Sequence, residues 1–210
     1  MGQLTEFFMK SAGGPPPGMG FSMPMMKGWV PRHVQPWLYV LTALCFQFSG
    51  GIYLGALDGI RGTTNFMIED ILFLLYATLA GMAVYFPILF RMKFRFTNKQ
   101  LLCGSAIVLA ICNVLTMHCQ SMHVLMIVCF IAGMAKIQGT FECMSNIQLW
   151  ITPRRDFAVF FPVLHIILLT AIEGSGWLAA WFGHHFTWQM MHVFTIGTMS
   201  VSYTHLTLPT

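Results

Sequence analysis

The chain has 210 residues, of which 56% are hydrophobic and only 9% are Asp, Glu, Lys or Arg. Soluble domains carry roughly 25% charged residues, so this composition excludes an ordinary water-soluble domain. The net charge of +4 does not indicate nucleic-acid binding, because Lys and Arg fall in short breaks between apolar segments, where anionic lipid headgroups are their expected neighbours.

The first 33 residues are rich in Gly, Pro and Met, with Gly-Gly-Pro-Pro-Pro-Gly at residues 13–18. Pro and Gly do not sustain a helix there, and no apolar signal-peptide core precedes a cleavage site. We therefore expect residues 1–33 to form a disordered cytoplasmic arm.

Long apolar stretches follow the arm. A helix needs roughly 20 apolar residues to cross a hydrocarbon core of about 30 Å. Stretches of that length lie near residues 34–55, 68–90, 101–118, 122–148 and 157–181, and a sixth begins near Trp188 and is still running at Ser200. The sequence therefore predicts an all-α, polytopic membrane protein with a six-helix bundle over residues 34–200. The breaks are short apart from the first, so consecutive helices are expected to be antiparallel neighbours.

Lys and Arg are concentrated in every second break. Nine of the eleven lie in the arm or in the breaks after the second and fourth stretches, at Lys10, Lys27, Arg32, Arg91, Lys93, Arg95, Lys99, Arg154 and Arg155. Basic residues near membrane ends stay on the cytoplasmic side. We therefore expect a multi-pass protein of the inner (cytoplasmic) membrane with its N-terminus in the cytoplasm.

The last ten residues, 201–210, read Val-Ser-Tyr-Thr-His-Leu-Thr-Leu-Pro-Thr and interrupt the sixth apolar stretch. The same peptide is one reading frame of a transposase-based sequencing adapter. We therefore expect residues 201–210 to be an artefactual tail, the sixth helix to be truncated, and the natural protein to continue beyond Ser200.

The six cysteines lie in or beside apolar stretches and form no CxxC pair. The adjacent His184 and His185, with His192 further on, have no Cys or carboxylate near them in the sequence. We expect neither a disulfide framework nor a metal site, and no cofactor.

Several local sequences resemble motifs of the major facilitator superfamily of transporters. The break at residues 91–99 is short and basic, like the family's loop after its second helix. Residues 135–139, Ala-Lys-Ile-Gln-Gly, are similar to its Arg-x-x-Gln-Gly pattern with Lys136 displaced by one position. Six helices with both ends in the cytoplasm are also what one half of such a transporter has.

Three further sequences continue this resemblance in the family's order. Residues 152–157, Thr-Pro-Arg-Arg-Asp-Phe, resemble the Pro-containing basic loop before the fifth helix. Residues 173–177, Glu-Gly-Ser-Gly-Trp, are similar to a Gly-rich stretch of antiporters, and residues 185–189, His-Phe-Thr-Trp-Gln, stand where drug:proton antiporters have a Trp-centred motif. The resemblance covers about residues 34–200 and implies the N-terminal six-helix half of a drug:proton antiporter-like protein.

The resemblance implies secondary active transport by alternating access, with proton-coupled export of amphipathic or toxic small molecules, as in multidrug resistance. The implied partners are a small-molecule substrate, protons, the lipid bilayer, the C-terminal half of the same chain, and an adaptor with an outer-membrane channel where export crosses two membranes. A nutrient or metabolite importer of the same fold is the alternative, and a six-helix channel or membrane enzyme is a more distant one. The sequence has no HExxH and no nucleophile with a partnered base, so we do not expect an enzyme.

Ionisable residues at membrane depth are costly, so each is a functional candidate beside a structural alternative. Glu142, Glu173 and His165 are the candidates for proton coupling. For Glu142 the alternative is a structural carboxyl that is hydrogen-bonded to Asn146 or Gln148. For Glu173 and His165 the alternatives are a packing-site carboxyl and a core histidine.

Polar side chains in the first and fourth stretches are candidates for a substrate cavity, namely Gln47, Lys136, Gln138 and Asn146. Lys136 would compensate charge or hold an anionic substrate, and its alternative is a structural ion pair or a snorkelling side chain. We expect the basic residues of the second cytoplasmic loop to steady a cytoplasmic gate: Arg91, Lys93, Arg95 and Lys99.

Overall fold

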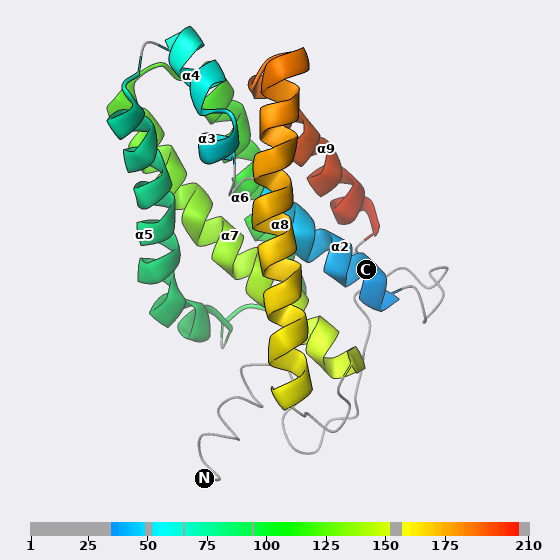
Figure 1. Ribbon diagram of the computed structural model, residues 1–210. Helices are drawn as coiled ribbons and strands as arrows, with labels where there is room; N and C mark the ends of the chain where they lie inside the picture. Colours follow the sequence, from blue (N-terminus) through cyan, green and yellow to red (C-terminus); the bar gives the residue numbers. More distant parts are fainter. Residues whose placement is uncertain (1–34, 49–51, 65, 94, 152–156, 206–210) are drawn as a thin grey trace, which may run out of the picture.

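The computed structural model describes residues 35–48, 52–64, 66–93, 95–151 and 157–205, which form helices and no strand (Figure 1). The helices are α2 (Gln35–Phe48), α3 (Ile52–Gly55), α4 (Leu57–Thr64), α5 (Ile68–Lys93), α6 (Asn98–His118), α7 (Met122–Ile151), α8 (Phe157–His185) and α9 (Gln189–His205). The all-helical prediction is confirmed for this part of the chain. The predicted arm and the basic loop at residues 152–156 lie outside it.

Four helices contain segments that are long and apolar enough to span a membrane: Ile68–Leu89, Asn98–His118, Met122–Ser145 and His165–His185. They correspond to four of the six predicted stretches. The first predicted stretch, 34–55, is divided between α2 and α3, and the apolar helix Trp37–Phe48 is shorter than the other four. The protein therefore has four described membrane-spanning candidates, and a bundle of six stays a prediction.

The end of the chain also differs from the predicted boundary at Ser200. Helix α9 continues to His205, so that it includes the first five residues of the predicted tail. The side chains from Val201 onward lie outside the described residues, and the artefactual origin of the tail stays a prediction.

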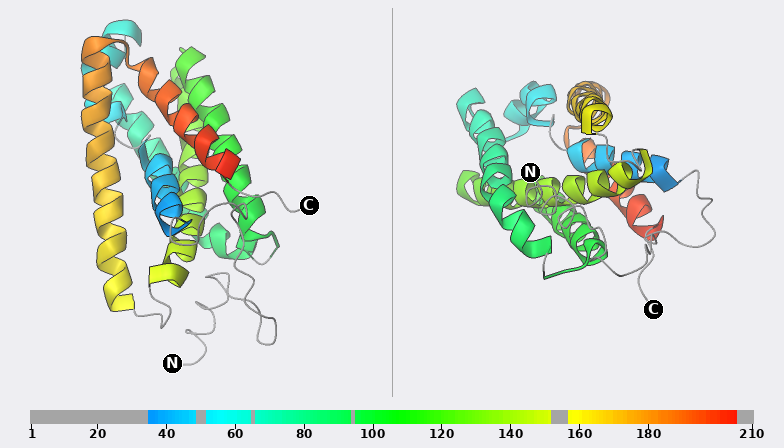
Figure 2. Two further views of the ribbon diagram at one scale, coloured as in Figure 1. Left: turned by 90° about the vertical axis from the view of Figure 1, so that its right-hand side faces the viewer. Right: turned by 90° about the horizontal axis from the view of Figure 1, so that it is seen from below.

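Helix α7 is central to the bundle. It packs against α2, α5 and α6, whereas α8 packs mainly against α2 and α3, and α9 against α6 and α2 (Figure 2). Helix α7 contributes side chains to both clusters of buried apolar residues. One cluster contains Phe46 and Leu109, and the other contains Ile52 and Ile71. Side chains of α7 that face these helices are therefore buried, among them Cys129, Ala135 and Cys143.

The α5–α7 contact depends on glycines. A Cβ at Gly81 of α5 would overlap the carbonyl oxygen of Phe130, and a Cβ at Gly133 of α7 would overlap the carbonyl oxygen of Thr78. Small residues allow helix backbones to approach this closely in membranes. The two glycines therefore allow the axes of α5 and α7 to lie close together.

The start of α6 is fixed by a capping box. The Thr97 hydroxyl accepts a hydrogen bond from the Gln100 backbone N–H at 3.4 Å, and the Gln100 side chain accepts one from the Thr97 N–H at 3.2 Å. These bonds satisfy donors that a helix N-terminus otherwise leaves open. The cap sets where the basic loop ends and the apolar wall of α6 begins.

Sequence reasoning did not predict α4, which lies in the first break between apolar stretches, the one break that was not expected to be short. Its Thr63 hydroxyl accepts a hydrogen bond at 2.7 Å from the indole N–H of Trp188, just before α9. The Trp188 side chain is buried, with 6% exposed. Helix α4 thus covers the turn between α8 and α9.

Candidate functional site

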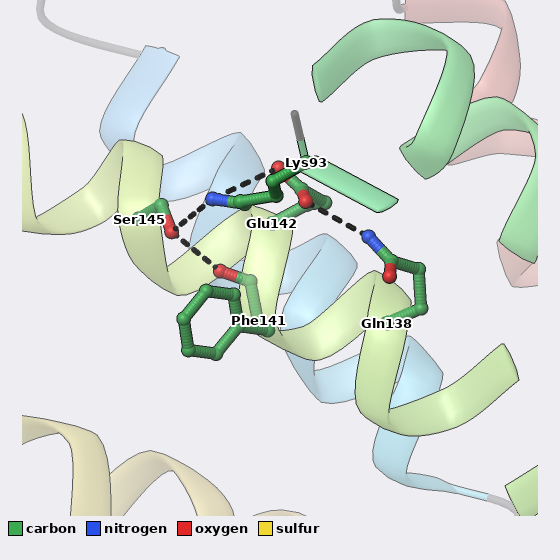
Figure 3. A network of polar contacts seen from close by, with 5 residues as sticks. All are labelled: Lys93, Gln138, Phe141, Glu142 and Ser145. Atoms are coloured by element: carbon green, nitrogen blue, oxygen red, sulfur yellow. Dashed lines mark hydrogen bonds and ion pairs between the residues drawn. The ribbon is translucent and has the colours of Figure 1, made fainter. Parts of the chain in front are cut away.

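Glu142 lies on α7 and is completely buried, with 0% of its surface exposed. One carboxylate oxygen, Oε2, is 3.5 Å from Lys93 Nζ at the end of α5. The other, Oε1, accepts a hydrogen bond from Gln138 Nε2 at 2.8 Å (Figure 3). The structure thus brings together a proton-coupling candidate, a gate-loop residue and a substrate-cavity candidate, which were predicted separately.

Lys93 reaches Glu142 from the last turn of α5, and its side chain is only 4% exposed. Its Nζ donates to Ser145 Oγ at 3.1 Å and lies 4.8 Å from the centre of the Phe141 ring. Burial lowers the pKa of the Lys93 ammonium, and the Glu142 carboxylate opposes that change. Lys93 is therefore held by three α7 residues within one turn of the helix (Figure 3).

A buried ion pair of this kind is sensitive to the loss of one member. Removing one partner typically destabilises a protein by about 3–5 kcal/mol, because the remaining charge is buried without compensation. A change in the charge of Glu142 consequently alters how firmly the end of α5 is held against α7.

Other polar residues of α7 lie on a different part of its surface. Lys136 is about 240° around the helix axis from Glu142. It is 1% exposed, and among the described residues it has no acidic partner. Thr140 lies one turn further along and accepts a hydrogen bond at 2.8 Å from Gln47 Nε2 of α2. Gln47 and Lys136 are thus buried in the bundle, away from the Lys93–Glu142 pair.

The remaining predicted residues are not brought to this pair. Glu173 and His165 lie on α8, where both are exposed. Arg91 and Arg95 are also exposed, whereas Lys99 is buried. Asn146 belongs to α7, but its side chain lies outside the described part of the structure.

Sequence reasoning missed a second buried polar contact, between α6 and α9. His192 Nδ1 lies 2.6 Å from Asn113 Oδ1, and the Asn113 amide donates to the Leu109 carbonyl at 2.9 Å. Both side chains are buried, and within the described residues His192 Nε2 has no hydrogen-bond partner. The signal in the sequence was Asn113, a polar residue inside an apolar stretch. In the described part of the chain, no three His, Cys, Asp or Glu side chains gather as a metal site would require.

A groove of about 500 Å³ lies beside the ion pair, with α5 and α6 as its walls and α7 as its floor. Most of its lining is apolar, and Gln138 is its link to Glu142. The volume falls within the range of roughly 300–1,000 Å³ that is typical of small-molecule sites.

Comparisons of the sequence with protein-family models and with curated proteins give no match.

Proposed function

We propose that the chain works in a proton-coupled secondary transporter of the major facilitator type, which exports amphipathic or toxic small molecules across the inner membrane. The observation that most supports this proposal is the completely buried Glu142, on a helix long enough to span a membrane and paired with Lys93 of another helix. Intramembrane ionisable residues are expensive and frequently belong to proton or substrate pathways. The N-terminus is cytoplasmic in this proposal, as the distribution of Lys and Arg favours.

Proton coupling works through the Lys93–Glu142 pair. The ionised carboxylate attracts the Lys93 ammonium and holds the end of α5, together with the basic loop that follows, against α7. Protonation of Glu142 removes its charge and leaves the ammonium without a counter-ion. The end of α5 then separates from α7 more easily, which is a movement that alternating access requires at a gate.

Substrate contact is assigned to the part of α7 that faces α2. Lys136 is a buried cation with no acidic partner among the described residues, and Gln47 is bound to Thr140 close by on the helix. A buried ammonium is stabilised by an anionic group. The proposal therefore favours substrates that carry an acidic group on an apolar body.

The test uses the natural gene, from its start codon to its own stop codon, in a bacterium that lacks its major exporters. We expect raised resistance to some members of a panel of amphipathic toxic compounds, with and without acidic groups. The resistance should disappear when the proton gradient is collapsed and in Glu142→Gln.

Two results would contradict the export proposal. Uptake of a labelled metabolite without any resistance would assign an importer of the same fold instead. Catalytic turnover by the purified protein without a gradient would exclude the transporter proposal as a whole.

A further inference from the structure

The groove between α5 and α6 has a lining that suits a hydrocarbon chain. Its apolar residues come from both walls, from the intervening loop and from the floor: Met92, Phe96, Leu101, Val108, Ile131 and Met134. Gly104 lies in the α6 wall, and a Cβ built there would meet no atom within 4 Å. The absence of a side chain at this position keeps the groove wide.

The groove has the depth of one membrane leaflet. It begins at Phe96, in the loop before α6, and extends along α6 to Val108. The ten helical steps from Asn98 to Val108 rise about 15 Å along a helix axis, which is half of a hydrocarbon core of about 30 Å. A partner helix that spans the membrane would need a contact surface over the full depth, so the groove fits a lipid chain better.

Two arginines are next to groove-lining residues in the sequence. Arg91 and Arg95 are exposed and stand on either side of Met92 in the sequence, next to Phe96. Neither has an acidic partner in the described part of the chain, whereas the neighbouring Lys93 is paired with Glu142. Arginine binds phosphate groups through paired N–H donors. The apolar groove is therefore adjacent, along the chain, to two exposed cationic side chains that could bind a phosphate group.

We propose that this groove binds one anionic phospholipid from the leaflet that borders the α5–α6 loop. One acyl chain lies along α6 and over α7, and the phosphate lies against Arg91 and Arg95. Basic clusters beside transmembrane helices recognise anionic headgroups in this way. Because the groove floor includes Gln138, which donates to Glu142, the bound lipid borders the ion pair.

The experiment is native mass spectrometry of the protein purified in detergent from its natural gene, with phosphatidylglycerol and phosphatidylcholine of identical acyl chains added in equal amounts. We expect one phosphatidylglycerol to be retained in preference to phosphatidylcholine. Arg91→Gln and Arg95→Gln should each weaken phosphatidylglycerol binding roughly fivefold, the equivalent of about 1 kcal/mol for each basic residue near anionic lipid. Phosphatidylcholine binding should not change.

The apolar part of the site is tested separately with Gly104→Phe, which should reduce the retention of both lipids. Gly197→Phe on α9 is the matched control, because a Cβ there also meets no atom within 4 Å and lies outside the groove. Equal retention of the two lipids by the unmodified protein would overturn the proposal, as would unchanged phosphatidylglycerol binding in a variant that combines Arg91→Gln with Arg95→Gln. The arginine variants alter exposed side chains, so they keep the test available if Gly104→Phe does not fold.

Discussion

Glu142 on α7 and Glu173 on α8 are two carboxylates in similar apolar sequence surroundings, but the fold gives them different environments. Glu142 is completely buried and interacts with Lys93 and Gln138. Glu173 is exposed on a helix whose Trp177 is also 68% exposed. The difference arises because α7 is enclosed by α2, α5 and α6, whereas α8 lies at the side of the bundle. An ionised carboxylate within a membrane is costly at either position. Glu142 lies against α5, which supplies Lys93 as its partner.

The largest effect that separates the two acids is expected on stability. Glu142→Ala leaves Lys93 buried without a counter-charge, so we expect it to lower the free energy of unfolding by about 3–5 kcal/mol. Glu173→Ala changes an exposed side chain and should stay within about 0.5 kcal/mol. Unfolding of the purified protein in mixed micelles, followed by loss of helical circular dichroism, measures both. Equal losses would show that burial does not distinguish the two carboxylates.

A double-mutant cycle sharpens the comparison by testing the partner itself. If Lys93 and Glu142 form an ion pair, Lys93→Met combined with Glu142→Leu should be less destabilising than the two single losses added together, with a coupling of about 1–3 kcal/mol. The same unfolding assay applies. As a control, Lys136→Met with Glu142→Leu should be additive within about 0.5 kcal/mol, because these residues point in different directions around α7. If the losses of stability in Lys93→Met and Glu142→Leu simply add in the double variant, the two residues do not form a stabilising ion pair.

Glu142 is enclosed because α5 and α7 approach each other closely. A substitution of Gly133 tests this contact. Gly133→Ala places a methyl group against the Thr78 carbonyl and should destabilise the protein by about 1–3 kcal/mol. Gly197→Ala meets open space on α9, so it should be neutral or stabilise by up to about 1 kcal/mol, since alanine favours the helix. Effects of the same sign and size at the two sites would contradict the tight α5–α7 contact.

Local sequence patterns predicted much of the fold. The stretches from residue 68 to residue 181 form helices of the expected length, because in these segments apolar composition and helix geometry act over neighbouring residues. The first stretch was predicted as one helix, whereas its described residues belong to α2 and α3. The short α4 carries Asp58, Arg61 and two threonines and so has no apolar signal, and its position depends on Trp188 far along the chain.

The candidate site was predictable only in part. The Gln138–Glu142 contact joins positions i and i+4 of one helix, so its spacing is visible in the sequence. The main partner of Glu142 was not, because Lys93 belongs to another helix and its position depends on how α5 crosses α7. The His192–Asn113 contact joins residues 79 positions apart and was missed for the same reason. Sequence reasoning identified the polar and ionisable side chains that are costly to bury, but it did not identify which of them contact one another.

The most direct test of the central claim is proton-coupled transport by the natural full-length protein in lipid vesicles that contain a pH-sensitive dye, with substrates taken from the resistance panel. The account predicts that substrate addition moves protons in the unmodified protein and in Glu173→Gln, and that Glu142→Gln, which keeps the side chain's size but removes its charge, moves none. Elution as a single folded species on size-exclusion chromatography is the control for each variant. Undiminished substrate-driven proton movement in Glu142→Gln would contradict the account.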